Sequence, residues 1–171
     1  MMWKYTGRKR PAFAEEPGPG EESVWDYPRP PRVEPDSRRI EVYAENEKIA
    51  DTRRAYRVLE TASPPTFYLP LQDVNRDLLI ALTNRTYCEW KGEARYWALA
   101  SDRDKKSVGW NYPEPTAPYE VIKAYFSFYP AAVACFVDGQ KVRPQPGKFY
   151  GGWVTDEIVG PFKGEPGSSD W

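Results

Sequence analysis

The stretch VACFVDGQKV, residues 133–142, decides the class of fold because it carries the clearest β-hairpin signal in the chain. Cys135 shares one strand face with the valines two positions before and after it, as residues facing a core do. Asp138 and Gly139 then tolerate the positive φ angles that a two-residue turn requires. The stretch therefore predicts two antiparallel strands with Cys135 buried.

The same alternation of apolar and polar residues recurs along the chain before this hairpin. IEVYAENEKIADT, residues 40–52, predicts a second hairpin that turns at residues 45–47. Further short strands are expected in RAYRVLE (54–60), TFYL (66–69), TYCEW (86–90), EARYWALA (93–100) and SVGWNYP (107–113). An aromatic fraction of 15% suits strands better than helices.

Two segments favour short helices. In PLQDVNRDLLIAL, residues 70–82, four apolar residues have the spacing of one helical face, which predicts an amphipathic helix lying on a sheet. They are Leu71, Val74, Leu78 and Leu82. A second helix is expected over about 118–126, with Thr116 near its N-cap. The sequence thus predicts a mainly β, antiparallel domain with two short helices, whose strand edges are hidden in packed sheets or a barrel-like closed sheet.

The composition excludes more functions than it suggests. The chain has 171 residues, enough for one domain with tails, and a formal net charge of −1 favours neither nucleic acid nor a membrane as partner. Without histidine, it lacks the usual general base and the commonest metal ligand. The two cysteines, Cys88 and Cys135, form no Cys-x-x-Cys pair, so no metal and no cofactor are expected. No apolar stretch is long enough for a membrane span, which predicts a cytoplasmic protein with reduced thiols.

The two ends of the chain differ in composition from its middle. Residues 1–38 hold seven of the 18 prolines and no sustained apolar period, which predicts an extended arm. Residues 144–171 are again rich in proline and glycine but keep several aromatic residues, and are read as a second arm. Residues 39–143 are then the domain proper.

A nearly repeated heptapeptide occurs once in the N-terminal arm, as VWDYPRP, and once in the domain, as GWNYPEP. In the domain copy, Trp110 and Tyr112 share a strand face that ends at a proline. We expect Trp25 and Tyr27 to pack the arm back on the domain in a similar extended form, over a sheet edge or one mouth of a cleft. A relic of tandem duplication is the alternative.

An ordered series of motifs resembles the domain of unknown function 427 family over about residues 40–142. The motifs are VLET (58–61), PPTFYLP (64–70), CEWKG (88–92) with A-x-Y-W (94–97), W-x-Y-P-x-P (110–115) and FY (128–129). With its arms the chain looks like a longer, cyanobacterial form of that family. The resemblance implies a β-tent-like fold, in which two sheets splay open and can hold a ligand between them. A nucleotidyltransferase label is attached to the family, and the zinc clasp of better-known β-tent proteins has no equivalent here.

Glu60 is the first candidate for a functional side chain. It ends a strand in phase with Tyr56 and Val58, and burial on that apolar side would suit an acid, a base or the anchor of a ligand. Alternatively, the strand ends there and Glu60 lies at the rim, paired with a neighbouring arginine.

Lys91 lies in a turn between two strands, where Gly92 permits positive φ and the lysine is expected to project outward. It is either a contact for an anionic ligand or an ordinary solvated lysine. Cys88 is expected to be a small buried residue, because no histidine is present to activate it as a nucleophile. Arg57 belongs to a basic cluster with Arg53 and Arg54 that could bind phosphate or carboxylate, although mutual pairing on a charged strand face is commoner.

The aromatic residues either line a concave ligand pocket or fill a small β core. Those that concern the candidate site are Tyr68, Tyr96, Trp110 and Tyr112, and the three tyrosines are expected to expose a hydroxyl.

Three classes of function follow. The first is a noncatalytic β module that binds a small ligand or a protein partner; its candidate ligand-binding residues are Arg57, Glu60, Tyr68, Lys91, Tyr96, Trp110 and Tyr112. The second is an enzyme, a hydrolase or a transferase, with Glu60 as general acid or base and Lys91 as electrostatic stabiliser. The third is a scaffold or assembly protein that docks through its proline-rich arms.

Overall fold

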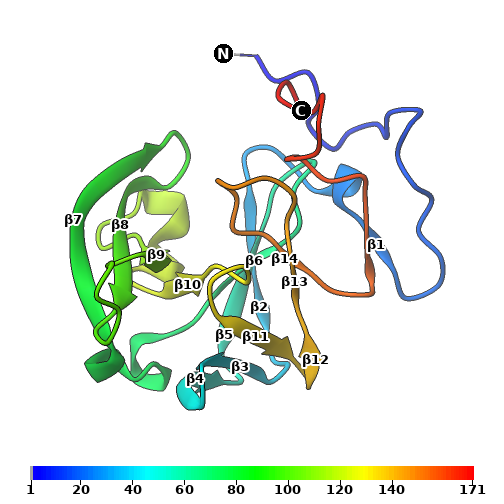
Figure 1. Cartoon of the computed structure of the whole chain (residues 1–171). Helices are drawn as coiled ribbons and strands as arrows, with labels where there is room; N and C mark the ends of the chain where they lie inside the picture. Colours follow the sequence, from blue (N-terminus) through cyan, green and yellow to red (C-terminus); the bar gives the residue numbers. More distant parts are fainter. Residues whose placement is uncertain (1) are drawn as a thin grey trace.

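The structure, a computed structural model, describes residues 2–171 and is built from short strands and 3-10 turns (Figure 1). Three antiparallel sheets form the body, with strand orders β10-β9-β8-β7, β12-β11-β3-β4 and β2-β5-β6. The mainly β, antiparallel class expected from the sequence is confirmed. The sheets do not close into a barrel.

The first four-stranded sheet contains β7 (Leu79–Cys88), β8 (Gly92–Leu99), β9 (Ser107–Asn111) and β10 (Phe126–Phe128). The second contains β3 (Ile40–Ala44), β4 (Glu47–Thr52), β11 (Ala134–Val137) and β12 (Gln140–Lys141). The three-stranded sheet contains β2 (Arg32–Asp36), β5 (Ala55–Leu59) and β6 (Thr66–Tyr68). Two small pairs complete the fold: β1 (Glu22–Ser23) runs parallel to β15 (Ile158–Val159), and β13 (Arg143–Pro144) is antiparallel to β14 (Trp153–Val154).

The hairpin predicted at residues 133–142 is confirmed as β11 and β12. Its turn residues have positive φ, 45° at Asp138 and 81° at Gly139, as a two-residue turn demands. Cys135 is buried opposite Val42 of β3, so the hairpin extends the sheet that begins with the 40–52 hairpin. That first hairpin is confirmed too, because β3 and β4 pair around a turn with positive φ at Glu45.

The amphipathic helix predicted for residues 70–82 is wrong. The segment makes two separate 3-10 turns, η2 (Leu71–Asp73) and η3 (Arg76–Leu78), and then enters β7. Its backbone groups bond to β4 instead of to each other: Val74 forms a β-bridge with Ala50, and the N–H of Asn75 donates to the carbonyl of Ile49 at 2.7 Å. These bonds replace the i→i−4 bonds of a helix, so tertiary pairing overrides the apolar spacing.

The second expected helix is also a 3-10 element, η4 (Ala117–Ile122), which is kinked at Tyr119. The chain leaves it through Ala124, whose φ is +61°, and then forms β10, a strand that the sequence did not predict. The N–H of Ala124 donates to the carbonyl of Tyr112 at 2.9 Å, which fixes this exit against the end of β9.

Two of the sheets meet at one point and diverge beyond it. Leu69, just after β6, exchanges two backbone hydrogen bonds with Phe126 of β10, of 2.8 and 2.9 Å. On one side of this junction, Phe67, Phe126 and Trp153 pack into the main apolar core. On the other side a second cluster, containing Tyr68, Trp110 and Tyr112, lies where the sheets separate.

The two arms pack against each other and against the domain. Trp25 is 0% exposed, and its indole N–H donates to the carbonyl of Pro161 at 3.1 Å. Its ring has edge contacts with the rings of Tyr5 and Trp171, which bring the chain ends together (Figure 1). Leu59 and Ala62 of the domain belong to the same buried cluster.

The expected extended form of the VWDYPRP segment is wrong, although its anchoring role agrees with the burial of Trp25 and Tyr27. Val24–Asp26 form a 3-10 turn, η1, because the hydroxyl of Ser23 accepts the backbone N–H of Trp25 at 3.2 Å and caps the turn. Within residues 2–171, no helix has the length and apolar character that crossing a membrane requires.

Candidate functional site

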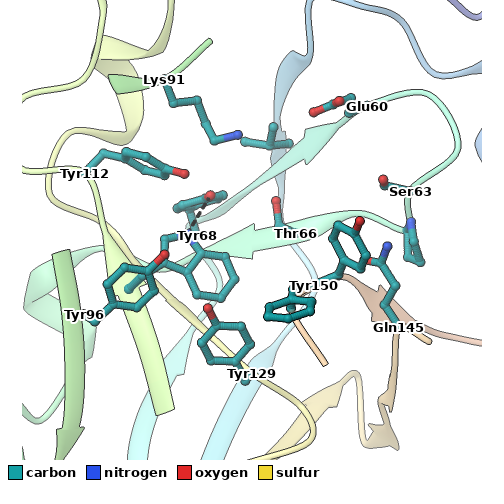
Figure 2. A pocket seen from close by; sticks show the side chains of 15 residues that line it. Glu60, Ser63, Thr66, Tyr68, Lys91, Tyr96, Tyr112, Tyr129, Gln145 and Tyr150 are labelled. Carbon is teal, nitrogen blue, oxygen red and sulfur yellow. Dashed lines mark hydrogen bonds between the residues drawn. The ribbon is translucent and has the colours of Figure 1, made fainter. Parts of the chain in front are cut away.

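A cavity of about 220 Å³ opens where the three-stranded sheet and the first four-stranded sheet separate (Figure 2). Its walls come from segments far apart in sequence. β5 and β6, with the turn between them, contribute Val58, Glu60, Ser63, Pro64, Thr66 and Tyr68. The opposite wall comes from Lys91, Tyr96, Trp110, Tyr112 and Tyr129. The segment after β13 adds Gln145, Phe149, Tyr150 and Gly151.

Six of the seven residues predicted to bind a ligand line this one cavity. They are Glu60, Tyr68, Lys91, Tyr96, Trp110 and Tyr112. Period two placed Glu60 in phase with Val58 and Trp110 in phase with Tyr112, and all four side chains line the cavity. The pairing of β5 with β6 and of β8 with β9 brings residues of neighbouring strands onto the same walls. The seventh, Arg57, points away from the cavity.

Lys91 does not project into solvent, so that expectation is wrong. The residue is 8% exposed, and its side chain reaches into the cavity (Figure 2). The turn that carries it is held from behind, because the carbonyl of Lys91 accepts the backbone N–H of Thr116 at 3.0 Å and the hydroxyl of Thr116 donates to the carbonyl of Trp90 at 2.5 Å. Gly92, with φ of +104°, then starts β8.

The ammonium of Lys91 is charged at neutral pH. Burial alone would lower the pKa of Lys91, but its acidic neighbours more than offset that effect and raise the pKa above its ordinary value. Those neighbours are Tyr68, Cys88 and Glu60. The nitrogen lies 5.5 Å from the centre of the Tyr112 ring, and it makes no ion pair with a carboxylate of residues 2–171.

Two phenol groups lie beside Lys91. The hydroxyl of Tyr68 accepts the indole N–H of Trp110 at 3.1 Å, a bond that joins β6 to β9 across the base of the cavity. Burial raises the pKa of both Tyr68 and Tyr112, so both phenols are neutral near pH 7. Figure 2 shows the hydroxyls of both tyrosines directed into the cavity.

Glu60 lies at the rim, one residue beyond β5. Its carboxylate accepts from Nε of Arg29 at 3.2 Å. The side chain of Arg29 is only 1% exposed and also donates to the carbonyls of Tyr5 and Thr61, at 2.9 and 3.0 Å. The structure therefore realises the alternative in which Glu60 pairs with an arginine, and that arginine comes from the N-terminal arm.

Tyr96 and Tyr129 form the lower wall of the cavity in Figure 2. The hydroxyls of Tyr96 and Thr86 lie 2.6 Å apart, so neighbouring strands β7 and β8 fix the position of Tyr96. The ring of Tyr129 packs on that of Trp110, with centres 4.7 Å apart. These contacts make this wall rigid and largely aromatic.

The sequence did not predict that the C-terminal segment would contribute to the site. The side chain of Gln145 accepts the N–H of Gly152 at 3.0 Å and donates to the carbonyl of Lys163 at 2.7 Å, which holds the intervening loop over the cavity. Tyr150 faces the opening (Figure 2), and Phe149 beside it is 87% exposed. The clustering of Phe149, Tyr150 and two glycines in one loop was the only local signal that could have indicated this contact.

Arg57 is instead the centre of a buried ionic cluster. Its guanidinium donates two hydrogen bonds to Glu22, of 3.0 and 3.2 Å, and a third to Glu34. The partners come from the N-terminal arm and β2, so Arg57 shows the mutual pairing of charges that was the alternative to a ligand contact. Arg57 therefore joins the arm to the domain.

The two cysteines lie in different surroundings. Cys135 is buried in the main core, and burial raises the pKa of its thiol. Cys88 is half-buried, packs against the aromatic cluster around the cavity and lies near Lys91. Among residues 2–171, no three cysteine, aspartate or glutamate side chains are grouped as metal ligands would be.

The fold and cavity define a class of β-rich domain in which splayed antiparallel sheets enclose an aromatic pocket. Residues 32–139, more than half of the chain, match the model of the NTP_transf_9 family, described as domain of unknown function 427. The chain belongs to this family. No curated protein resembles the chain closely enough to count as a relative.

Proposed function

We propose that the chain is a noncatalytic module that binds a small molecule in the cavity between the sheets. The observation that carries the proposal is the convergence of Lys91, Tyr68 and Tyr112 from three different elements on one partly enclosed, aromatic-walled space. Ligand sites commonly combine an apolar lining with a few convergent polar groups in this way. A volume of about 220 Å³ is smaller than the roughly 300–1,000 Å³ of most such sites, which favours a small ligand.

The positions of Glu60 and Arg29 favour binding over catalysis. A general base needs a carboxylate that can exchange a proton with a bound substrate. The carboxylate of Glu60 is the partner of a buried arginine, and no ion pair joins it to Lys91. A hydrolase or transferase built on Glu60 and Lys91, including one of the nucleotidyltransferase kind, therefore finds less support than binding.

The burial of the arm anchors likewise counts against a scaffold that docks through its arms. Trp25 and Tyr27, the aromatic residues suited to dock on another protein, are 0% and 4% exposed. They are already used in packing within the chain.

The test is a thermal-shift screen of the full chain against nucleotides, sugars, organic acids and amino-acid derivatives. We expect at least one class to raise the melting temperature, because a ligand that binds only the folded state stabilises it. Ser63→Phe should abolish the shift, since the serine lines the cavity and its hydroxyl bonds to no residue of the described part of the chain. Ser101→Phe, at an exposed position away from the cavity, is the matched control. An absence of shifts in all classes, or a shift that survives Ser63→Phe, would contradict the proposal.

Recovery of the bound compound separates binding from catalysis. We expect mass spectrometry after prolonged incubation to return the compound unchanged. Conversion to a product that depends on Glu60 or Lys91 would make the protein an enzyme.

A further inference from the structure

The inner end of the cavity contains an ammonium group without a direct ion-pair partner in the described part of the chain. Lys91 is more than nine-tenths buried, and its ammonium has no carboxylate partner within residues 2–171. Glu60, the nearest acid along the rim, is paired with Arg29. The described residues offer the ammonium only the longer-range attraction of Glu60, so an anion in the cavity would supply the direct ion-pair partner that Lys91 lacks.

Two neighbouring hydroxyl groups also lack an acceptor for their protons among residues 2–171. The oxygen of Tyr68 already accepts from Trp110, so its own proton remains to be donated. The hydroxyl of Tyr112 makes no hydrogen bond to any residue of the described chain, and it faces the cavity (Figure 2). Together with the ammonium of Lys91, these groups offer donors to one space and need an acceptor.

Charged side chains of both signs lie around the rim. Burial and then the positive charge of Arg29 lower the pKa of Lys163, whereas the carboxylates of Glu60 and Glu89 raise it. The nitrogen of Lys163 is 5.9 Å from the centre of the Tyr150 ring at the opening. Glu60 is already paired with Arg29, and the exposed Glu89 is outnumbered by Lys91 and Lys163, which leaves an excess of positive charge at the cavity and its opening.

We propose that the cavity binds a small organic anion, with its carboxylate or phosphate group held by Lys91, Tyr68 and Tyr112 and its planar body against the aromatic wall of Trp110 and Tyr129. This inference rests on the proposed function and specifies its ligand class. A neutral molecule would leave the ammonium unpaired, and a cation would be repelled by it. An anion satisfies the ammonium and both phenols at once, and charge-assisted hydrogen bonds are the stronger kind.

The test is isothermal titration calorimetry of the full chain at neutral pH with benzoate, phenyl phosphate, inorganic phosphate and neutral benzamide. We expect benzoate or phenyl phosphate to bind at least about tenfold more tightly than benzamide. Whichever of benzoate and phenyl phosphate binds more tightly shows whether the site prefers a carboxylate or a phosphate. Weaker binding of inorganic phosphate than of phenyl phosphate would show that the aromatic ring of the ligand contributes to affinity.

Variants of Lys91 isolate the charge. Lys91→Met should weaken anion binding about tenfold or more and benzamide binding much less, whereas Lys91→Arg should retain the preference for anions. Lys106→Met, at an exposed turn, is the matched control and should bind as the wild type does. Circular dichroism confirms that each variant is folded, and Lys91→Arg tests the charge even if Lys91→Met fails to fold.

Two results would overturn the inference without touching the proposed function. One is benzamide binding as tightly as benzoate in the wild type, and the other is anion affinity that is unchanged in Lys91→Met. A thermal-shift screen in which only neutral ligands bind, and in which Ser63→Phe abolishes their binding, would support the binding module but contradict an anionic ligand. If no compound in the screen and none of the four calorimetry probes binds, both the proposed function and the anionic ligand are contradicted.

Discussion

The indole ring of Trp110 lies directly against the backbone of Gly151, so closely that a Cβ atom added at Gly151 would come within 2.2 Å of Cη2 of Trp110. This contact joins β9, inside the segment that matches the family, to a loop beyond it. The C-terminal segment can therefore cover the cavity only because residue 151 has no side chain.

Replacing Gly151 by alanine should displace the loop from Trp110. We expect an overpacking cost of about 1–3 kcal/mol in the free energy of unfolding and a change in tryptophan fluorescence, measured by chemical denaturation. Gly18→Ala is the control, because its Cβ would meet only the flexible side chain of Glu21, at 3.2 Å. Equal stability of the two variants would mean that the loop does not pack on Trp110 in solution.

Trp25→Ala should cost about 3–5 kcal/mol of unfolding free energy, as large-to-small substitutions of buried aromatic residues do. The ring is completely buried between both arms and the domain, and the substitution also removes its bond to Pro161. Urea denaturation of Trp25→Ala and of the control Phe149→Ala, at an 87% exposed ring, measures the difference. A loss in Trp25→Ala below about 0.5 kcal/mol would show that the arm is not part of the folded unit.

Glu60→Gln should destabilise the protein by about 1–3 kcal/mol, because it removes the one carboxylate within residues 2–171 that pairs with the buried Arg29. Differential scanning calorimetry against Glu114→Gln, an exposed carboxyl with no ion pair among the described residues, checks this. Wild-type stability in Glu60→Gln would free the carboxylate for chemistry and revive the enzyme hypothesis.

Acid should loosen the attachment of the arms. Burial alone would raise the pKa values of Glu22 and Glu157, but hydrogen bonds from Arg57 and Arg38 outweigh it and hold both below their ordinary value. A carboxyl whose pKa is lower in the folded state stabilises the fold fully above its unfolded pKa, about 4.3, and loses that contribution as the pH falls through the folded value.

The free energy of unfolding should therefore decrease progressively below about pH 4. Glu22→Gln should flatten this decrease, and Glu120→Gln, whose exposed carboxylate lies 4.0 Å from Lys123, should not. Denaturant titrations between about pH 7 and pH 3 measure the slopes. An unchanged slope in Glu22→Gln would mean that its bonds to Arg57 contribute nothing in solution.

Local patterns were sufficient wherever a short segment determines its own conformation. The turn at Asp138 and Gly139 and the shared face of Trp110 and Tyr112 follow from residue type and period two, and the structure agrees with them. The spacing of four apolar residues also fits one face of a helix, but the helix predicted from it does not form. These residues are Leu71, Val74, Leu78 and Leu82. The bridge of Val74 to Ala50 of β4 and the pairing of the start of β7 with the end of β8 decided that segment, and both partners lie outside it.

The sequence by itself determined that the chain is a mainly β protein of this family, that it lacks histidine chemistry, and which strand faces carry the candidate residues. Only the tertiary structure decided that Lys91 turns inward, where it has no ion-pair partner among the described residues. It also decided that Glu60 pairs with Arg29 and Arg57 with Glu22, both partners coming from the N-terminal arm, and that a C-terminal loop covers the cavity. The physical reason is that a side chain's partners are set by long-range packing. Period two specifies the face on which a residue lies, but the segment that will meet that face is fixed only when distant strands and arms come together.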